Sequence, residues 1–158
     1  MAVDMFLDIP PIKGESKDNT HKEKMDILAW SWGMSNSGSG HVGGGSGSGK
    51  VNVQDISLTK YIDKASPDLM KSCCNGKHFD KATLIVRKAG EKPLEYITIT
   101  MTDVMITAVS TGGSGGEDRL TENVTLNFTK VKVQYKEQAK TGAQAAAPEF
   151  EWSIEGNA

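Results

Sequence analysis

The stretch EYITITMTDVMITAVS, Glu95 to Ser110, decides the fold of this chain. Its first half places apolar side chains on odd positions, from Ile97 to Met101, whereas its second half, from Val104 to Ala108, places them on even positions. Successive side chains of a strand point to opposite faces, so a strand keeps one phase unless a bulge or bend interrupts it. The change of phase predicts a long strand that turns a corner, as strands do in a small closed barrel.

Two other stretches change phase in the same way. TENVTLNFTKVKVQYKEQ, Thr121 to Gln138, has apolar residues on even positions up to Phe128 and on odd positions from Val131. VNVQDISL, Val51 to Leu58, changes phase in its middle. Each change marks either a bend within one strand or the end of one strand followed by a short turn. Three changes in one chain favour bent strands and a barrel or sandwich of β-strands.

Other segments with the pattern or composition of strands are Val3–Ile9, Met25–Met34, Val51–Ile62, Lys81–Ala89 and Glu149–Ile154. One short helix is expected at about residues 66–75, with Ser66 as the N-cap, Pro67 at the first helical position and Gly76 as the left-handed residue at its end. We therefore expect a mainly β fold: a small β-barrel-like domain of antiparallel strands with one short α-helix. The length of 158 residues suits a single domain spanning residues 1–158.

The composition limits the partners and the compartment. The formal net charge is −2, and Lys and Arg are spread along the chain without the basic patch that nucleic acid or a membrane surface requires. The N-terminus, MAVDMFLDIPP, lacks the basic start and apolar run of a signal peptide, and no stretch approaches the length of a transmembrane helix. The adjacent Cys73 and Cys74 form no disulfide framework, and we expect both to be small buried hydrophobes. These features predict synthesis in a reducing cytoplasm, no nucleic-acid partner and no membrane insertion.

Three short patterns imitate catalytic or metal sites. Gly44 to Lys50 has the spacing of a phosphate-binding loop, but Val51 stands where that loop needs Ser or Thr, and a β-like stretch follows instead of a helix. GGSGG at 112–116 matches a hydrolase nucleophile motif, but a turn and a strand follow it. The three histidines lie in polar or Gly-rich segments, and the cysteines lack zinc-site spacing. We expect no catalytic residue, no cofactor, no metal and no enzyme activity.

The run STGGSGGEDRLTENVTLNF, Ser110 to Phe128, closely resembles the haemolysin-coregulated protein (Hcp) family, the tube subunits of bacterial type VI secretion systems. KGESKD (13–18), LAWSWGMS (28–35) and GKVNVQDISLTKYIDKASPDLM (49–70) look like the same family in the same order, so the resemblance covers essentially the whole chain. It weakens at the double proline of FLDIPPIKG (6–14) and in the connector KTGAQAAAPEF (140–150).

The resemblance implies a homo-hexameric ring with a wide pore, stacked with other rings into an inner tube. A contractile sheath would drive this tube, tipped by a spike protein, into a neighbouring cell, and small secreted effectors would be carried and protected in the pore. The protein would be cytoplasmic before assembly and then secreted without a cleaved signal peptide. The alternative is a phage-tail-tube-like protein or a binding adaptor on the same fold, without a role in secretion.

Residues that line the pore should be small and polar. In the alternating stretch Leu28 to Met34, Trp30 and Trp32 share the large apolar face and should point into the core, so Ser31 should point into the lumen. Ser57 and Thr59 are weaker lumen candidates, since they are opposite in phase to the apolar residues of their strand. The alternative is that these three residues merely face solvent or an interface.

Two Gly-rich segments are candidates for contacts between subunits. The first segment is expected to be an inter-subunit or inter-ring loop that is ordered only where a neighbour holds it, because ordering glycine-rich backbone costs conformational entropy; its candidate residues are Ser39, His41, Val42, Gly44, Ser46 and Lys50. A plain disordered loop is the alternative. The second segment is an expected interface turn, with candidates Gly113, Ser114, Glu117, Asp118 and Arg119. Arg119 should pair with a carboxylate within the turn or in a neighbouring subunit.

Overall fold

The structure, a computed structural model, describes residues 3–38, 50–90, 93–137 and 147–158. Its elements, in chain order, are β1 (Val3–Asp8), β2 (Met25–Ser31), β3 (Met34–Ser35), β4 (Asn52–Val53), β5 (Ile56–Tyr61), α1 (Ser66–Asn75), β6 (His78–Lys88), β7 (Leu94–Thr111), β8 (Thr121–Asn127), β9 (Lys130–Tyr135) and β10 (Glu149–Ser153).

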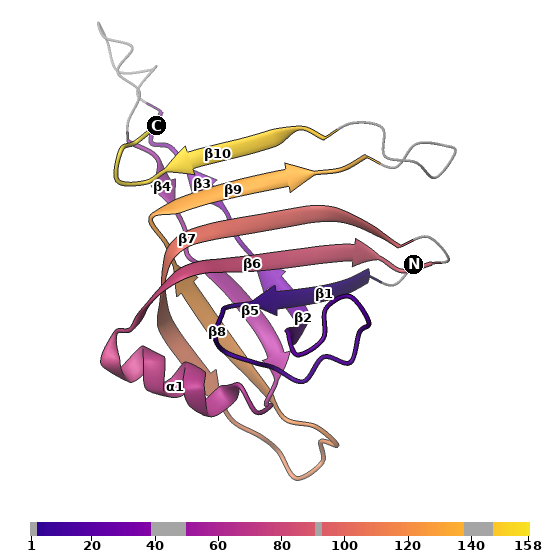
Figure 1. Cartoon of the computed structure of the whole chain (residues 1–158). Coiled ribbons are helices and arrows are strands. Elements are labelled where there is room, and N and C mark those ends of the chain that lie inside the picture. Colours follow the sequence, from indigo (N-terminus) through magenta and orange to yellow (C-terminus); the bar gives the residue numbers. More distant parts are fainter. Residues whose placement is uncertain (1–2, 39–49, 91–92, 138–146) are drawn as a thin grey trace, which may run out of the picture.

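Six strands form a closed antiparallel barrel (Figure 1). Their order is β7-β6-β1-β2-β5-β8, and pairing of β8 with β7 closes the ring. β9 and β10 extend the sheet beyond the N-terminal half of β7, and β3 pairs with β4 in a separate ribbon. The prediction of a mainly β, barrel-like antiparallel fold with one short helix is confirmed.

β7 is the strand that turns the corner. It runs unbroken through 18 residues, and its change of phase falls at Asp103, which has a positive φ of 54°. Before this residue β7 pairs with β9, and after it β7 pairs with β8, so one strand serves both the extension and the barrel. The predicted bend is confirmed. A second irregularity between Ile106 and Ala108 changes the phase again, so Ala108 is exposed, contrary to the expected pattern.

The other two changes of phase are short turns between separate strands. β8 ends at Asn127 and β9 begins at Lys130; β4 ends at Val53 and β5 begins at Ile56. The backbone N–H of Thr129, in the first of these turns, donates to the carbonyl of Thr102 on β7. For these two stretches the bent-strand interpretation was wrong and the alternative of a strand end with a short turn was right.

Helix α1 closes the lower end of the barrel in Figure 1 and buries Leu69 in the common core. Full burial of one leucine side chain contributes roughly 1.5–3 kcal/mol. Gly76 ends the helix with a φ of 67°, as predicted. The N-cap is Ala65 rather than the predicted Ser66, which is the first residue of the helix and donates its hydroxyl to Glu122.

The two cysteines lie in different environments. Cys73 is half-buried and packs against the core, whereas Cys74 is exposed. A helix of ten residues buries only one face against the barrel, and Cys74 is off that face. The prediction that both cysteines are buried was therefore wrong for Cys74.

Candidate functional site

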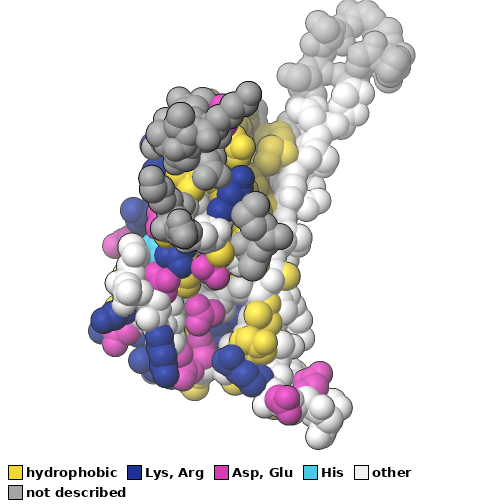
Figure 2. All heavy atoms as spheres, turned by 90° about the vertical axis from the view of Figure 1, so that its right-hand side faces the viewer, with side chains coloured by type: hydrophobic (Ala, Val, Ile, Leu, Met, Phe, Trp, Pro, Cys, Tyr) yellow, Lys and Arg dark blue, Asp and Glu magenta, His cyan; other side chains and the backbone are white. Residues whose placement is uncertain are grey.

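The outward face of β2, β5, β8 and the C-terminal half of β7 carries two rows of small, uncharged residues. In these rows, residues of adjacent strands lie directly opposite one another. The first row is Ser31, Ser57, Thr125 and Ala108, and the second is Ala29, Thr59, Asn123 and Ser110. We call these eight residues the small-residue face. Figure 2 shows few charged side chains along its right-hand side, the rear of the barrel in Figure 1, where β5 runs.

Local geometry fixes which residues reach this face. A register shift between Ile27 and Ala29 lets Ile27 point into the core, whereas Leu28 is 40% exposed. Trp30 and Trp32 pack against the core, as predicted, and Ser31 between them is exposed. Leu28 does not share the core-facing side with the tryptophans, because the shift changes the phase of β2 before Trp30 is reached.

Hydrogen bonds hold several of the face's polar side chains in place. Thr59 Oγ1 donates to Asn123 Oδ1 at 2.8 Å. Beyond the end of the rows, Asp55 accepts from Thr107 Oγ1 at 3.0 Å and from Asn127 Nδ2 at 2.9 Å. Ser57 is exposed and Thr59 is half-buried, so both sequence candidates on β5 lie on the same outward face as Ser31.

The turn from Gly112 to Leu120 closes on itself and returns beside this face. A Cβ added to Gly113 would lie 2.5 Å from Leu120 Cδ2, so a side chain at this position meets the Leu120 side chain. Ser114 accepts a hydrogen bond from the backbone of Glu117, also within the turn, at 3.1 Å. A cavity of about 400 Å³ lies between the turn and the face and is lined by residues of both, including Ser110 and Asn123.

Arg119 does not pair with a carboxylate within its own turn, which was one of its two expected partners; a carboxylate of a neighbouring subunit stays a prediction. Its guanidinium lies over the Tyr61 ring, 3.7 Å from the centroid, and among the described residues it forms no ion pair. Tyr61 is on the same side of β5 as Ser57 and Thr59, since side chains of a strand alternate. The arginine therefore anchors the turn to the end of β5, while Asp118 stays exposed at the tip.

A buried charged cluster lies inside the barrel beneath α1, and the sequence analysis missed it. Lys60 and Glu122 are opposite each other in the β5–β8 register, with 0% and 1% exposure. Lys60 Nζ donates to Glu122 Oε1 at 2.6 Å, to Asp63 Oδ1 at 2.8 Å and to the Tyr61 carbonyl at 2.9 Å. Ser66 Oγ also donates to Glu122 Oε1, at 2.6 Å. The missed signal is that Lys60 and Glu122 continue the buried phase of their strands.

The loop between β1 and β2 is held by a second set of charges. Arg87 donates to both carboxylate oxygens of Asp18, at 2.6 and 3.1 Å, and to Asp4 at 3.1 Å. The hydrogen bond from Arg87 keeps the pKa of Asp18 well below its usual value. His21, expected in a solvated loop, is only 4% exposed, and its Nε2 lies 2.6 Å from Glu95 Oε1.

The Gly-rich loop is largely outside the described residues. Of its six candidates, Ser39, His41, Val42, Gly44 and Ser46 lie there, while Lys50 is described and is exposed just before β4. Within the ranges that the structure describes, no three His, Cys, Asp or Glu side chains are grouped to hold a metal ion. No helix in those same ranges is long and apolar enough to cross a membrane.

Comparisons with known proteins place these features in a family. A family model described as type VI secretion system effector, Hcp, matches residues 6–135. The chain is 64% identical to the protein Hcp1 of Pseudomonas aeruginosa over 159 residues, covering 99% of this chain and 98% of that protein. The crystal structure of Hcp1 from Salmonella typhimurium has a TM-score of 0.80 at 35% identity, covering 100% of this chain and 99% of that one.

A second solved structure indicates the same family. The crystal structure of a type VI secretion system effector from Yersinia pestis has a TM-score of 0.78 at 36% identity, covering 95% of this chain and 99% of that one. With the family model and a full-length relative in agreement, the chain belongs to the Hcp family of type VI secretion system proteins.

Proposed function

We propose that this protein is a structural, non-enzymatic tube subunit that forms hexameric rings, which stack into the inner tube of a type VI secretion system. The observation that carries the proposal is the small-residue face: a broad, uncharged, outward surface on a closed barrel in a chain of this family. Because its side chains are short, six such faces turned inward would leave an open channel.

In this arrangement Ser31, Ser57 and Thr59 contact effectors carried in the lumen. Ser31 and Ser57 are directly opposite each other on β2 and β5, so one cargo group can reach both hydroxyls. Short hydroxyl side chains offer both a donor and acceptors and adapt to different partners. Such contacts suit a carrier that holds several small proteins and releases them after delivery.

The neighbouring subunit is proposed to cover the surface at the β3–β4 ribbon. Met34 and Phe150 are 45% and 39% exposed, and they line an apolar groove of about 260 Å³ together with Val53 and Trp152. β10 is at the end of the sheet order, and among the strands of the described residues its one neighbour is β9. An unpaired strand edge beside an apolar groove favours a second chain there. The loop candidates from Ser39 to Lys50 and the turn from Gly113 to Arg119 would add contacts between subunits or rings.

The remaining partners follow from the type VI assignment. The tube would meet sheath, baseplate and spike proteins of the same machine, and it would pass from the cytoplasm to the outside without a cleaved signal peptide. The family description as a secretion system effector supports this route. A phage-tail-tube-like protein or an adaptor on the same fold is the competing function.

Secretion and cargo carriage can be tested together in the native cell. The protein should reach the culture supernatant in cells with an intact type VI machine and stay in the cytoplasm when the sheath protein is deleted. Purified rings should carry a small co-purifying protein. Release that does not depend on the sheath would contradict the tube role, and a monomeric protein that still binds a partner would favour the adaptor.

A further inference from the structure

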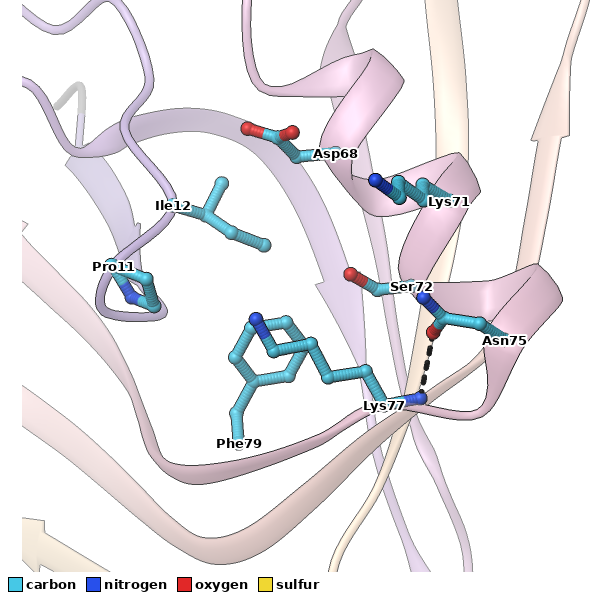
Figure 3. Close-up of a pocket in the computed structure, with 8 residues that line it drawn as sticks. All are labelled: Pro11, Ile12, Asp68, Lys71, Ser72, Asn75, Lys77 and Phe79. Atoms are coloured by element: carbon cyan, nitrogen blue, oxygen red, sulfur yellow. Dashed lines mark hydrogen bonds between the residues drawn. The ribbon is translucent and has the colours of Figure 1, made fainter.

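A pocket of about 330 Å³ lies between helix α1, the start of β6 and the turn that follows β1 (Figure 3). Its apolar part is formed by Pro11, Ile12 and Phe79, of which Ile12 and Phe79 are buried side chains of the barrel. β1 and β6 carry none of the small-residue face, although β1 neighbours β2 and β6 neighbours β7 in the barrel. The pocket therefore shares no residue with that face.

A hydroxyl without a partner in the described protein points into this pocket. Ser72 is only 5% exposed, and its hydroxyl forms no hydrogen bond with any residue that the structure describes. Figure 3 shows its oxygen directed into the cavity, toward Ile12. The Ser72 carbonyl, by contrast, already accepts the N–H groups of Gly76 and Lys77 at the end of the helix. The Ser72 oxygen is not among the fully buried atoms that lack a partner, so it is open to the cavity and free to bond a ligand atom there.

Two lysines bring positive charge to the same cavity. Lys71 comes from α1 and Lys77 from the segment before β6, and neither forms an ion pair within the described parts of the chain. The Lys77 ammonium lies 5.1 Å from the centroid of the Phe79 ring, over the apolar part of the pocket. Asn75 Oδ1 accepts the Lys77 backbone N–H at 3.0 Å, which leaves the Asn75 Nδ2 free to donate. Four donor groups thus converge around one space.

Asp68 is the one acidic residue that lines the pocket, so the two ends of the pocket differ in charge. Asp68 lies in the first turn of α1, at the end of the pocket far from Lys77 (Figure 3). An anionic ligand is repelled at that end and attracted toward the Lys77 ammonium, while the Lys71 ammonium lies on the helix side of the pocket, nearer Asp68 (Figure 3). Among the apolar residues that line the pocket Pro11 is exposed, so a bare inorganic anion would leave part of the apolar lining uncovered. An anionic group attached to an apolar one matches the whole cavity.

We propose that this pocket is a docking site for an acidic peptide segment of a partner protein. A Glu or Asp carboxylate accepts hydrogen bonds from Lys71, Lys77 and Ser72, and a neighbouring apolar side chain of the peptide packs on Ile12 and Phe79. Charge complementarity carries the choice of partner, since two unpaired ammonium groups face one carboxylate. The site does not depend on ring formation and goes beyond the tube function.

Binding of a labelled peptide tests the proposal. The probe is a fluorescein-labelled, C-terminally amidated peptide of alternating Leu and Glu, and its control has Gln in place of every Glu. Fluorescence polarisation with the full-length protein should show saturable binding of the Glu peptide, at least about ten-fold tighter than that of the Gln peptide. Equal affinity for the two peptides, or no binding at millimolar concentration, would overturn the proposal.

Matched variants locate the site. The double variant Lys71→Gln/Lys77→Gln should weaken binding of the Glu peptide about ten-fold or more. The control Lys17→Gln/Lys130→Gln removes the same charge from exposed positions that do not line the pocket and should bind like the parent. An equal loss in both doubles would mean nonspecific attraction and would refute the site.

Two further experiments identify the class of ligand and keep the proposal testable if one variant fails to fold. Ser72→Ala keeps both lysines and should weaken binding several-fold; if the lysine double variant fails to fold, an unchanged affinity in Ser72→Ala overturns the proposal on its own. Inorganic phosphate at the same concentration as the peptide should not displace the peptide. Full displacement by such phosphate would mean a simple anion site and would contradict peptide docking. Ring size is measured separately by light scattering, so a failure of the tube proposal would be seen independently.

Discussion

Lys60 Nζ and Glu122 Oε1 lie 2.6 Å apart, with both side chains sealed inside the barrel. The pair joins β5 to β8 and, through Ser66, also holds the start of α1. Glu122 lies two residues after Leu120, whose carbonyl accepts the Ile62 N–H at the base of the turn from Gly112 to Leu120. One buried pair thus connects the barrel, the helix and the turn.

Breaking this pair should cost more than replacing it. Lys60→Met leaves the Glu122 carboxylate buried without its charge partner, so the free energy of unfolding should fall by about 3–5 kcal/mol. The double variant Lys60→Met/Glu122→Leu removes both charges of the pair but still leaves Asp63 without Lys60, so it should recover part of that loss. Urea unfolding at one fixed protein concentration measures both variants. If the double variant were less stable than Lys60→Met, the pair would not be the source of the effect.

Lengthening Ser31 should impair cargo retention without disturbing the subunit. Gln at this exposed position projects over the small-residue face and removes the hydroxyl, and loss of one hydrogen bond of about 1 kcal/mol corresponds to roughly five-fold weaker retention. The readout is the amount of co-purifying protein per ring. Thr20→Gln, on the exposed loop after β1, is the matched control and should retain cargo normally. Unchanged retention in Ser31→Gln would count against the lumen role of this residue.

The turn from Gly112 to Leu120 has little room for a side chain at Gly113. Gly113→Val introduces atoms within reach of the Leu120 side chain, whose exposed end must shift, so the cost should lie at the lower end of the about 1–3 kcal/mol typical of overpacking. Leu120→Ala combined with Gly113→Val should restore part of the lost thermal stability. A Cβ at Gly115 meets nothing within 4 Å, so Gly115→Ala is the control. Equal melting temperatures for the Gly113 and Gly115 variants would show that the turn can relax.

Asp18 should contribute stability that is lost in acid. Its pKa is lowered in the folded state, chiefly by the Arg87 hydrogen bond, so the folded protein binds a proton less readily there than the unfolded chain. The contribution is fully present above the ordinary carboxylate pKa of about 3.9 and falls as the pH drops from that value toward the lowered one. Unfolding free energies between neutral pH and strong acid should show a shallower acid decline for Asp18→Asn than for the parent. Parallel curves would contradict this assignment.

The bend in β7 could be predicted because a change of phase is recorded in the residues themselves. The sequence could not separate that bend from the turns after β8 and β4, since a two-residue connection and a bulge shift the pattern alike. The register shift after Ile106 could not be predicted either, because Ala108 is apolar but small enough to lie on either face of the strand.

Parts of the candidate surfaces depend on pairing that no local pattern reveals. Ser31 and Ser57 could each be predicted to point outward, but their direct opposition requires the β2–β5 register. Lys60 and Glu122 are 62 residues apart. Each, taken alone, is a charged residue at a strand position where the alternating pattern is otherwise apolar. The Arg119 position over Tyr61 needed the path of the turn, which Gly-rich sequence leaves open.

The central claim is that this chain assembles into rings whose inner wall is the small-residue face. Electron microscopy of the purified protein, with its mass in solution measured on the same sample, tests it most directly. The account predicts six-fold rings with an open pore and a mass near six times the 17.0 kDa of one chain. A particle with the mass of a monomer or dimer at micromolar concentration, without a pore, would contradict it.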